Sequence, residues 1–148
     1  MTQNVDGLHQ KAGSKNVIEL HGNIEKIKCL NCEHETNWPQ LATWENSEMV
    51  CDICNGLLKP SVIAIGENLN LNDWKNSKEK FRTCDSLIII GTQLKISSVT
   101  ELVADARRNS ARIIVINPSS IGIPIFDGDT YLPFPSEKVL PSIGLLLE

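Results

Sequence analysis

Two unbroken apolar runs dominate the second half of the chain. One lies within residues 85–91 and the other within residues 112–118, and continuous rather than alternating runs are typical of strands buried on both faces. Between them, residues 99–109 place apolar side chains on one face of a predicted helix and charged ones on the other. A strand, a helix and a strand within about 33 residues predict a βαβ unit with parallel strands.

Shorter patterns predict the remaining elements. Alternating residues with β-branched side chains favour strands, and an apolar run bounded by Pro and Gly favours a buried strand. An Asn before an amphipathic stretch favours the start of a helix. These patterns predict strands at 17–20, 24–28 and 62–65, a helix from Asn72 to about Arg82, and a terminal helix within 131–148 that packs on the sheet. The predicted fold class is α/β with a parallel sheet.

Composition narrows the classes of function. The 148 residues are 41% hydrophobic, which allows one domain with a core and a small insert. The formal net charge of −4 argues against a nucleic-acid partner, which would need a basic face. No apolar run approaches the roughly 18 residues of a membrane span. No charged-then-apolar leader precedes the first motif, so a secretion signal is not expected either.

Four of the five cysteines form two Cys-x-x-Cys pairs, Cys29 with Cys32 and Cys51 with Cys54, separated by eighteen residues. Each such turn directs two sulfurs toward one centre, and Zn²⁺ takes four ligands in a tetrahedron. The spacing predicts a zinc site in an insert at residues 28–59, with two disulfides or four buried thiols as alternatives. Because four thiolates leave no coordination position open, the metal is expected to be structural.

Further predictions concern residues between the cysteine pairs and the fifth cysteine. Trp38, Pro39, Leu41 and Trp44 are expected to cover the metal site. Cys84 precedes an apolar run and is expected to be a small buried side chain, with a reactive thiol as the alternative. Unpaired thiols are typical of a reducing compartment, so a cytoplasmic location is expected.

Polar residues gather at the start of the chain and after the first predicted strand. Segment 2–9 holds Gln, Asn, Asp and His side chains, which can offer amide, carboxylate and imidazole groups to a ligand or form a solvated turn. His21 follows the strand predicted at 17–20 and precedes Gly22, which lets a ligand or another backbone approach closely. His21 is a candidate for an exposed site, with a hydrogen-bonded structural histidine as the alternative.

Further candidates follow the two buried strands. Parallel sheets bind ligands at the carboxyl ends of their strands, which here are Gly91-Thr92-Gln93 and the segment beginning at Asn117. Gly91 permits close approach, and loop amides and hydroxyls can hold phosphate or ribose groups. The loop lacks a Gly-x-Gly-x-x-Gly pattern, so a doubly wound domain without a nucleotide is the alternative.

Together these motifs resemble those of the sirtuins, the NAD-dependent protein deacylases. The resemblance implies a Rossmann-like NAD-binding domain at residues 1–27 and 60–148, N-terminally incomplete, with a zinc ribbon at 28–59 inserted. NAD and an acyl-lysine peptide would meet between the two domains. The resemblance is carried by 2–9 (Thr-Gln-Asn-Val-Asp-Gly-Leu-His), 19–22 (Glu-Leu-His-Gly), the cysteine pairs, 60–67 (Pro-Ser-Val-Ile-Ala-Ile-Gly-Glu), 91–94 (Gly-Thr-Gln-Leu) and 116–117 (Ile-Asn).

The resemblance also implies a mechanism. The acyl oxygen attacks the ribose carbon that bears nicotinamide, nicotinamide leaves, and neutral His21 then takes a proton from a ribose hydroxyl that attacks the acyl carbon. Imidazole suits this step because its unperturbed pKa lies near working pH. Gln3 and Asn4 would contact the nicotinamide ribose and Asp6 the carboxamide, so that Asn4 and Asp6 act with His21. Water then completes the reaction, which gives free lysine, nicotinamide and O-acyl-ADP-ribose.

The same comparison implies residues that bind substrate and cofactor. The acyl-lysine peptide would add as a strand along a channel. The phosphate and adenosine side of NAD would lie against the carboxyl ends of the buried strands. The channel residues implied are Ile63, Gly66 and Glu67, and the nucleotide residues are Gly91, Thr92, Gln93 and Asn117.

The sequence departs from the sirtuin pattern in several places. Sirtuins begin with a strand and a Gly-Ala-Gly-x-Ser loop for the NAD phosphates, and nothing in this sequence corresponds to them. We therefore expect a fragment, a shortened product, or a partner chain that completes a sheet with an open edge or an uncovered face. Gln93 stands where the family usually has Ser, Ile65 where it has Phe, and Ser98 where it has Pro. These changes bear on affinity and acyl preference.

The sequence leaves more than one class of function open. The resemblance implies an NAD-dependent protein-lysine deacylase, with ADP-ribosyl transfer from the same site as a variant. A non-catalytic binding module, made of a zinc ribbon on half a Rossmann sheet, is the alternative. A nucleic-acid-binding ribbon is disfavoured because the charge of residues 28–59 is mixed and no basic-aromatic stripe is present.

Overall fold

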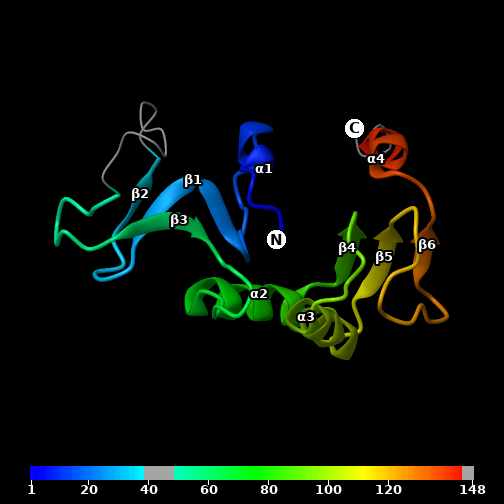
Figure 1. The fold of residues 1–148 in the computed structure, drawn as a ribbon. Helices are drawn as coiled ribbons and strands as arrows, with labels where there is room; N and C mark the ends of the chain where they lie inside the picture. Colours follow the sequence, from blue (N-terminus) through cyan, green and yellow to red (C-terminus); the bar gives the residue numbers. More distant parts are fainter. Residues whose placement is uncertain (39–48, 145–148) are drawn as a thin grey trace. The chain divides into compact units, whose positions relative to one another are not determined.

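Two three-stranded sheets organise the chain in the computed structural model, which describes residues 1–38 and 49–144 (Figure 1). One sheet belongs to a compact unit spanning Met1–Lys75, and the other to a unit spanning Asn76–Glu148. Helix α2 (Leu71–Thr83) runs from the first unit into the second. In the part of the chain that the structure describes, no helix is both long and apolar enough to cross a lipid bilayer.

The sheet of the first unit is antiparallel. Its central strand β1 (Gly22–Cys29) pairs with β2 (Glu35–Asn37) on one side and β3 (Leu58–Val62) on the other. The strand predicted at 24–28 is confirmed. The buried strand predicted at 62–65 is wrong, because strand pairing ends at Val62 and the chain turns back through a hydrogen bond from the Glu67 amide to the Ala64 carbonyl, 3.0 Å long.

The strand predicted at 17–20 is also wrong. Among these residues, Glu19 alone forms a β-bridge, which is parallel and joins it to Thr2. The Thr2 amide donates to the Ile18 carbonyl (2.8 Å), and the Leu20 amide donates to the Thr2 carbonyl (3.1 Å). Segment 2–6 therefore runs beside residues 18–21 and leads into the short helix α1 (Leu8–Lys11).

The sheet of the second unit confirms the predicted βαβ unit. Strands β4 (Ser86–Ile90) and β5 (Arg112–Ile116) are parallel, and α3 (Ser97–Arg108) connects them. A third parallel strand, β6 (Thr130–Leu132), was not predicted because three residues are too few to show a period. The buried apolar residues of this unit are Ile89, Leu94, Val99, Leu102, Val103, Ala106, Ala111, Ile113, Val115 and Ile116.

The predictions for the open edge of the sheet, the terminal helix and the start of α2 are confirmed only in part. Within the described residues β4 pairs with β5 alone, and Ile88 and Ile90 of β4 are 47% and 41% exposed, as expected for a sheet with an uncovered face. The predicted terminal helix is present as α4 (Ser136–Gly144). The predicted N-cap of α2 is wrong by two residues, because Asn70 Oδ1, not Asn72, accepts the amides of residues 72 and 73.

A cluster of charges joins α2 to α3. The Asp105 side chain is 1% exposed and lies 3.0 Å from Lys78 Nζ and 3.2 Å from Arg82 Nε, and it also pairs with Arg108. Burial, the largest single influence, would raise the pKa of the Asp105 carboxyl, but hydrogen bonds from Lys78 and Arg108 outweigh it and lower that pKa. Beside Lys78, the buried Ser77 hydroxyl has no hydrogen-bond partner among the described residues.

Candidate functional site: a four-cysteine centre and the surroundings of His21

The four cysteines predicted to bind zinc come together. Their sulfurs all lie within 4.8 Å of one another, with 3.5 Å between Cys29 and Cys54 and 3.7 Å between Cys32 and Cys51. A zinc tetrahedron with Zn–S bonds of about 2.3 Å has S–S edges of about 3.8 Å. The four sulfurs therefore fit Zn²⁺, and with four thiolate ligands the ion would serve as a structural crosslink.

The two Cys-x-x-Cys turns have the same backbone geometry. In each, the first cysteine donates its amide hydrogen to the carbonyl five residues later and accepts the amide hydrogen from four residues later. The residue after each second cysteine has a left-handed backbone, with φ of +60° at Glu33 and +54° at Asn55. The bonds are Cys29 to His34 and Glu33 to Cys29 in the first turn, and Cys51 to Gly56 and Asn55 to Cys51 in the second.

The surroundings of the sulfurs shift the pKa values of Cys54 and Cys32 in opposite directions. The Gly56 amide, followed by the Asn31 side chain, lowers the pKa of Cys54 to about 6. At Cys32 the largest influence, the His34 amide, acts in the same direction, but the crowded sulfurs and burial together raise its pKa to about 12. Zn²⁺ binds cysteine in the thiolate form, so metal binding at this cluster would release the thiol protons.

Gly56 lies against the first Cys-x-x-Cys turn, although the sequence indicated only a turn at this position. A Cβ atom at this position would lie 2.7 Å from Asn31 Cβ and 3.0 Å from Cys29 Sγ. The second turn can therefore close against the first only with glycine there. Of the residues expected to cover the metal, Trp38 is half-buried, and Pro39, Leu41 and Trp44 lie outside the described residues.

Cys84 differs from the expectation of a buried side chain. It is half-buried, and its sulfhydryl donates to the Phe81 carbonyl at 3.5 Å. It lies at the end of α2, which explains its partial exposure.

His21 lies where segment 2–6 meets the first sheet. Its Nδ1 is 3.2 Å from the carbonyl oxygen of Gln3, and its own carbonyl accepts the amide hydrogen of Ile63 at 2.9 Å. The ring is half-buried. A carbonyl oxygen can only accept, so in the neutral ring Nδ1 carries the hydrogen and Nε2 keeps its lone pair.

Gly22 allows the close approach on which this arrangement depends. Its φ is +80°, and a Cβ atom would lie 2.0 Å from the carbonyl oxygen of Ser61. The sequence predicted that either a ligand or another backbone would approach here, and the structure places the backbone of β3 in that position. Strand β3 can thus reach the end of β1, where the Ile63 amide meets His21.

The other candidates of segment 2–9, Asn4 and Asp6, make local contacts. Asn4 is exposed, and its amide donates to Thr2 Oγ1 at 3.1 Å. Asp6 is half-buried, and its Oδ1 accepts the Leu8 amide hydrogen at 3.0 Å, at the start of α1. Of the three candidates in this segment, Gln3 is the one for which the structure gives a contact with His21.

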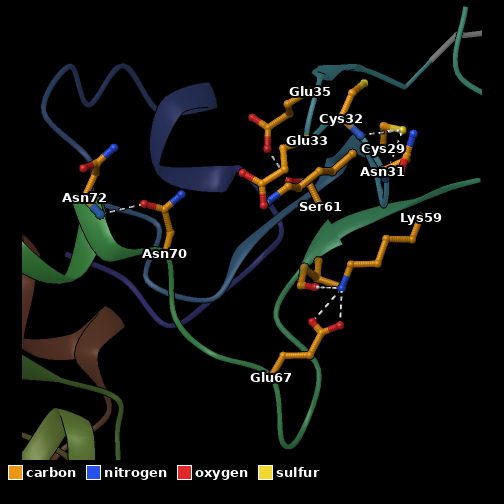
Figure 2. Close-up of polar contacts among 12 residues, drawn as sticks. Cys29, Asn31, Cys32, Glu33, Glu35, Lys59, Ser61, Glu67, Asn70 and Asn72 are labelled. Atoms are coloured by element: carbon orange, nitrogen blue, oxygen red, sulfur yellow. Dashed lines mark hydrogen bonds and ion pairs between the residues drawn. The ribbon is translucent and has the colours of Figure 1, made fainter. Parts of the chain in front are cut away.

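A loop at residues 63–67 carries the predicted peptide-channel residues. Figure 2 shows Lys59 reaching across to Glu67, with Nζ 2.5 Å from Oε1 and 2.6 Å from Oε2. Hydrogen bonding to Lys59, then to the Ala64 amide, lowers the pKa of the Glu67 carboxyl. Ile63 is half-buried, whereas Gly66, with φ of +92°, is exposed.

Lys59 is a contact residue that sequence reasoning missed. The sequence shows only that Glu67, with the opposite charge, follows Lys59 by eight residues. The contact between the two can be inferred only when the chain is known to turn back after β3 through loop 63–67. Both Lys59 and Glu67 line a cavity of about 580 Å³ in the first unit. Carboxylates predominate among its charged groups, which are Glu19, Glu33, Glu35, Glu67, Asp73, Lys28 and Lys59.

The remaining candidates lie in the second unit, at the carboxyl ends of β4 and β5. Gly91 has φ of +62°, and a Cβ atom there would have nothing within 4 Å, so the strand end opens into free space that a ligand can enter. Thr92 Oγ1 accepts the Leu94 amide hydrogen at 3.2 Å, and the Gln93 carbonyl accepts that of Gly122 at 2.6 Å. These contacts fix the loop after β4.

Asn117 fixes the loop after β5. It is 4% exposed, and its Nδ2 donates to the Ser119 carbonyl at 2.6 Å. The Tyr131 hydroxyl donates to the same carbonyl at 2.9 Å. The side chain of Asn117 therefore holds the loop after β5, against which the resemblance to sirtuins predicts the adenosine side of NAD.

Comparison with known proteins shows the family. The Sir2 family model matches residues 1–98 of the 148. The NAD-dependent protein deacylase of Aquifex aeolicus is 40% identical over 128 residues, which are 83% of this chain and 51% of the relative. The NAD-dependent protein deacetylase of Clostridium acetobutylicum is 35% identical over 148 residues, covering 100% of this chain and 56% of the relative.

Solved structures agree with the sequence comparison. A Sir2 homologue in complex with NAD has a TM-score of 0.88 at 28% identity, covering 99% of this chain and 56% of that one. A Sir2 protein with a p53 peptide and NAD⁺ has a TM-score of 0.81 at 30% identity, covering 97% and 62%. The chain spans about half the length of the curated relatives it matches. It is a member of the Sir2 family, the sirtuins.

Proposed function

We propose that this chain carries part of the active site of an NAD-dependent protein-lysine deacylase. The observation that supports this most directly is the position of His21, whose Nδ1 is 3.2 Å from the Gln3 carbonyl and whose own carbonyl accepts the amide of Ile63. The relatives that match this chain are named NAD-dependent protein deacylases and deacetylases. When bound, NAD supplies an electrophilic ribose carbon with nicotinamide as its leaving group.

In this proposal His21 is the general base. The Gln3 carbonyl fixes the hydrogen on Nδ1, so Nε2 is the nitrogen that accepts a proton from a ribose hydroxyl. Gln3 and Asn4 contact the nicotinamide ribose, and Asp6 contacts the carboxamide. Asp6 retains one carboxylate oxygen for this contact, because the Leu8 amide occupies the other.

Each of the two substrates has its own proposed set of binding residues. The acyl-lysine peptide pairs with loop 63–67 as an added strand, with Ile63, Gly66 and Glu67 along the channel. Gly91, Thr92, Gln93 and Asn117 hold the phosphate and adenosine side of NAD. The open space at Gly91 and the fixed loop at Asn117 support this assignment, because a phosphate needs close backbone approach.

The proposal includes the organisation of the whole chain. Residues 28–59 form a zinc-ribbon insert, and residues 1–27 and 60–148 belong to the Rossmann-like domain. A partner chain along β4 is proposed to complete the sheet, which the position of β4 at the edge of the sheet within the described residues supports. The location is cytoplasmic, which the unpaired thiols support. No nucleic-acid partner is proposed, because the net charge is −4.

The test is nicotinamide release from NAD by the 148-residue chain, with and without an acetyl-lysine peptide, beside His21→Ala. We expect release that requires the peptide and is lost in His21→Ala, with zinc content and melting temperature unchanged. Mass spectrometry of the products separates deacylation from ADP-ribosyl transfer. Release at the same rate in His21→Ala would remove the assigned base, and a zinc-loaded, folded chain without any release would favour a binding module.

A further inference from the structure

The Lys59–Glu67 pair encloses the predicted peptide-binding loop. Lys59 Nζ contacts both carboxylate oxygens of Glu67 and also donates to the Val62 carbonyl at 3.2 Å. Glu67 Oε2 in turn accepts the Ala64 amide hydrogen at 2.9 Å. The pair therefore holds the start and the end of loop 63–67 through four polar contacts, and Figure 2 shows the three contacts of Lys59 meeting at its ammonium group.

The loop that this pair closes has no apolar anchor at its tip. Ile65 is fully exposed, and Gly66 beside it needs a left-handed backbone. On its N-terminal side the loop is tied to the His21 carbonyl through the Ile63 amide. On its C-terminal side, the contacts of Glu67 hold the chain. Without the charge pair, the tip would sample many backbone conformations, and ordering it would oppose binding.

We propose that Lys59 and Glu67 are positioning residues that hold loop 63–67 in the folded-back shape to which an acyl-lysine peptide binds. This inference rests on the proposed function, because it assumes that loop 63–67 receives the peptide. It assigns to Lys59 a role in substrate affinity, and it separates that role from the proton transfer at His21.

The geometry distinguishes this pair from an ordinary surface ion pair. Lys59 and Glu67 side chains are 27% and 41% exposed, and the ammonium meets both carboxylate oxygens and a backbone carbonyl. The Lys11–Glu25 pair in the same unit has one contact, and its side chains are 56% and 52% exposed. Exposed single-contact pairs contribute little to stability. Lys11–Glu25 therefore provides a matched control.

The test measures binding of a fluorescent acetyl-lysine peptide to the 148-residue chain in the presence of NAD, by anisotropy. Variants are Lys59→Met, Glu67→Gln, Lys59→Arg, and the control Lys11→Met. We expect Kd to rise roughly three- to tenfold in Lys59→Met and Glu67→Gln, as for loss of a partly exposed charged contact. Lys59→Arg should stay within about twofold of wild type, because guanidinium also pairs with both carboxylate oxygens.

A second readout reports on the loop itself. Amide hydrogen exchange over residues 63–67 should be faster in Lys59→Met and unchanged in Lys11→Met, while zinc content stays the same in all variants. Equal Kd values in Lys59→Met, Glu67→Gln and Lys11→Met would overturn the inference and leave the peptide site intact. Failure of the wild-type chain to bind the peptide would overturn the proposed peptide site, and the inference with it.

Discussion

Substitution of Gly22 by alanine tests how closely β3 must approach β1. The new methyl group would lie 2.0 Å from the Ser61 carbonyl oxygen, on backbone with φ of +80°. The left-handed backbone costs alanine about 1–2 kcal/mol. Forcing a methyl group against a backbone atom costs about 1–3 kcal/mol more. We therefore expect Gly22→Ala to lower the free energy of unfolding by about 2–5 kcal/mol.

Gly13→Ala is the matched control, because it separates backbone strain from the clash. Gly13 also has a positive φ, +91°, but a Cβ atom there has nothing within 4 Å. It should carry the conformational cost alone, about 1–2 kcal/mol. The difference between the two variants is then the cost of the clash at Ser61.

The assay is thermal unfolding with zinc in the buffer. A change of 1 kcal/mol shifts the melting temperature of a chain of this size by about 2–4 °C. Gly22→Ala should therefore melt on the order of 10 °C below wild type, and Gly13→Ala about 3–6 °C below. If the two variants melted within about 2 °C of each other, the close approach of Ser61 would have no energetic consequence and the reasoning would be refuted.

Three further predictions follow from other contacts. Cys51→Ser should lose zinc and soluble protein, measured by metal analysis of the purified chain, and a stable zinc-free variant would contradict the structural role of the metal. Asp105→Asn should destabilise the chain by about 2 kcal/mol in urea titrations at neutral pH. Because Lys78 and Arg108 lower the folded-state pKa of Asp105, its contribution is present above the unfolded-state pKa and is lost as pH falls through the folded-state value, so the wild-type advantage should disappear in acid. Ser77→Ala should be neutral or stabilise by up to about 1 kcal/mol in the same titrations, because the buried hydroxyl has no partner among the described residues; a clear loss of stability would reveal one.

The parts of the structure that the sequence predicted correctly depend on local spacing. A Cys-x-x-Cys turn brings its own two sulfurs together, so the grouping of Cys29, Cys32, Cys51 and Cys54 follows from spacing. The βαβ unit was predicted because its strands are long, apolar and separated by one helix. Motifs also indicated His21, but its contact with the Gln3 carbonyl required the structure.

The incorrect predictions concern features that distant contacts decide. Residues 17–20 alternate like a strand, yet their backbone bonds go to Thr2 and leave a single bridge. Asn70 and Asn72 are both good capping residues, and only the path of the chain decides between them. The Lys59–Glu67 pair was not predicted at all, because it joins β3 to a loop and no local sequence period reveals such a contact. For the same reason, the roles of Asn4, Asp6 and Asn117 stay predictions.

The hydrogen bond between the Ile63 amide and the His21 carbonyl has a consequence for how such a protein can diverge. It fixes the backbone of the proposed base and the root of the proposed substrate loop to each other. Ile65, two residues further along, is fully exposed and outside this bond. If loop 63–67 receives the acyl-lysine peptide as proposed, substitution of Ile65 is predicted to alter which acyl chains are accepted while leaving the bond between Ile63 and His21 in place. Substitutions that change substrate specificity are therefore expected at the loop tip, and substitutions that change the reaction rate are expected near Ile63 and His21.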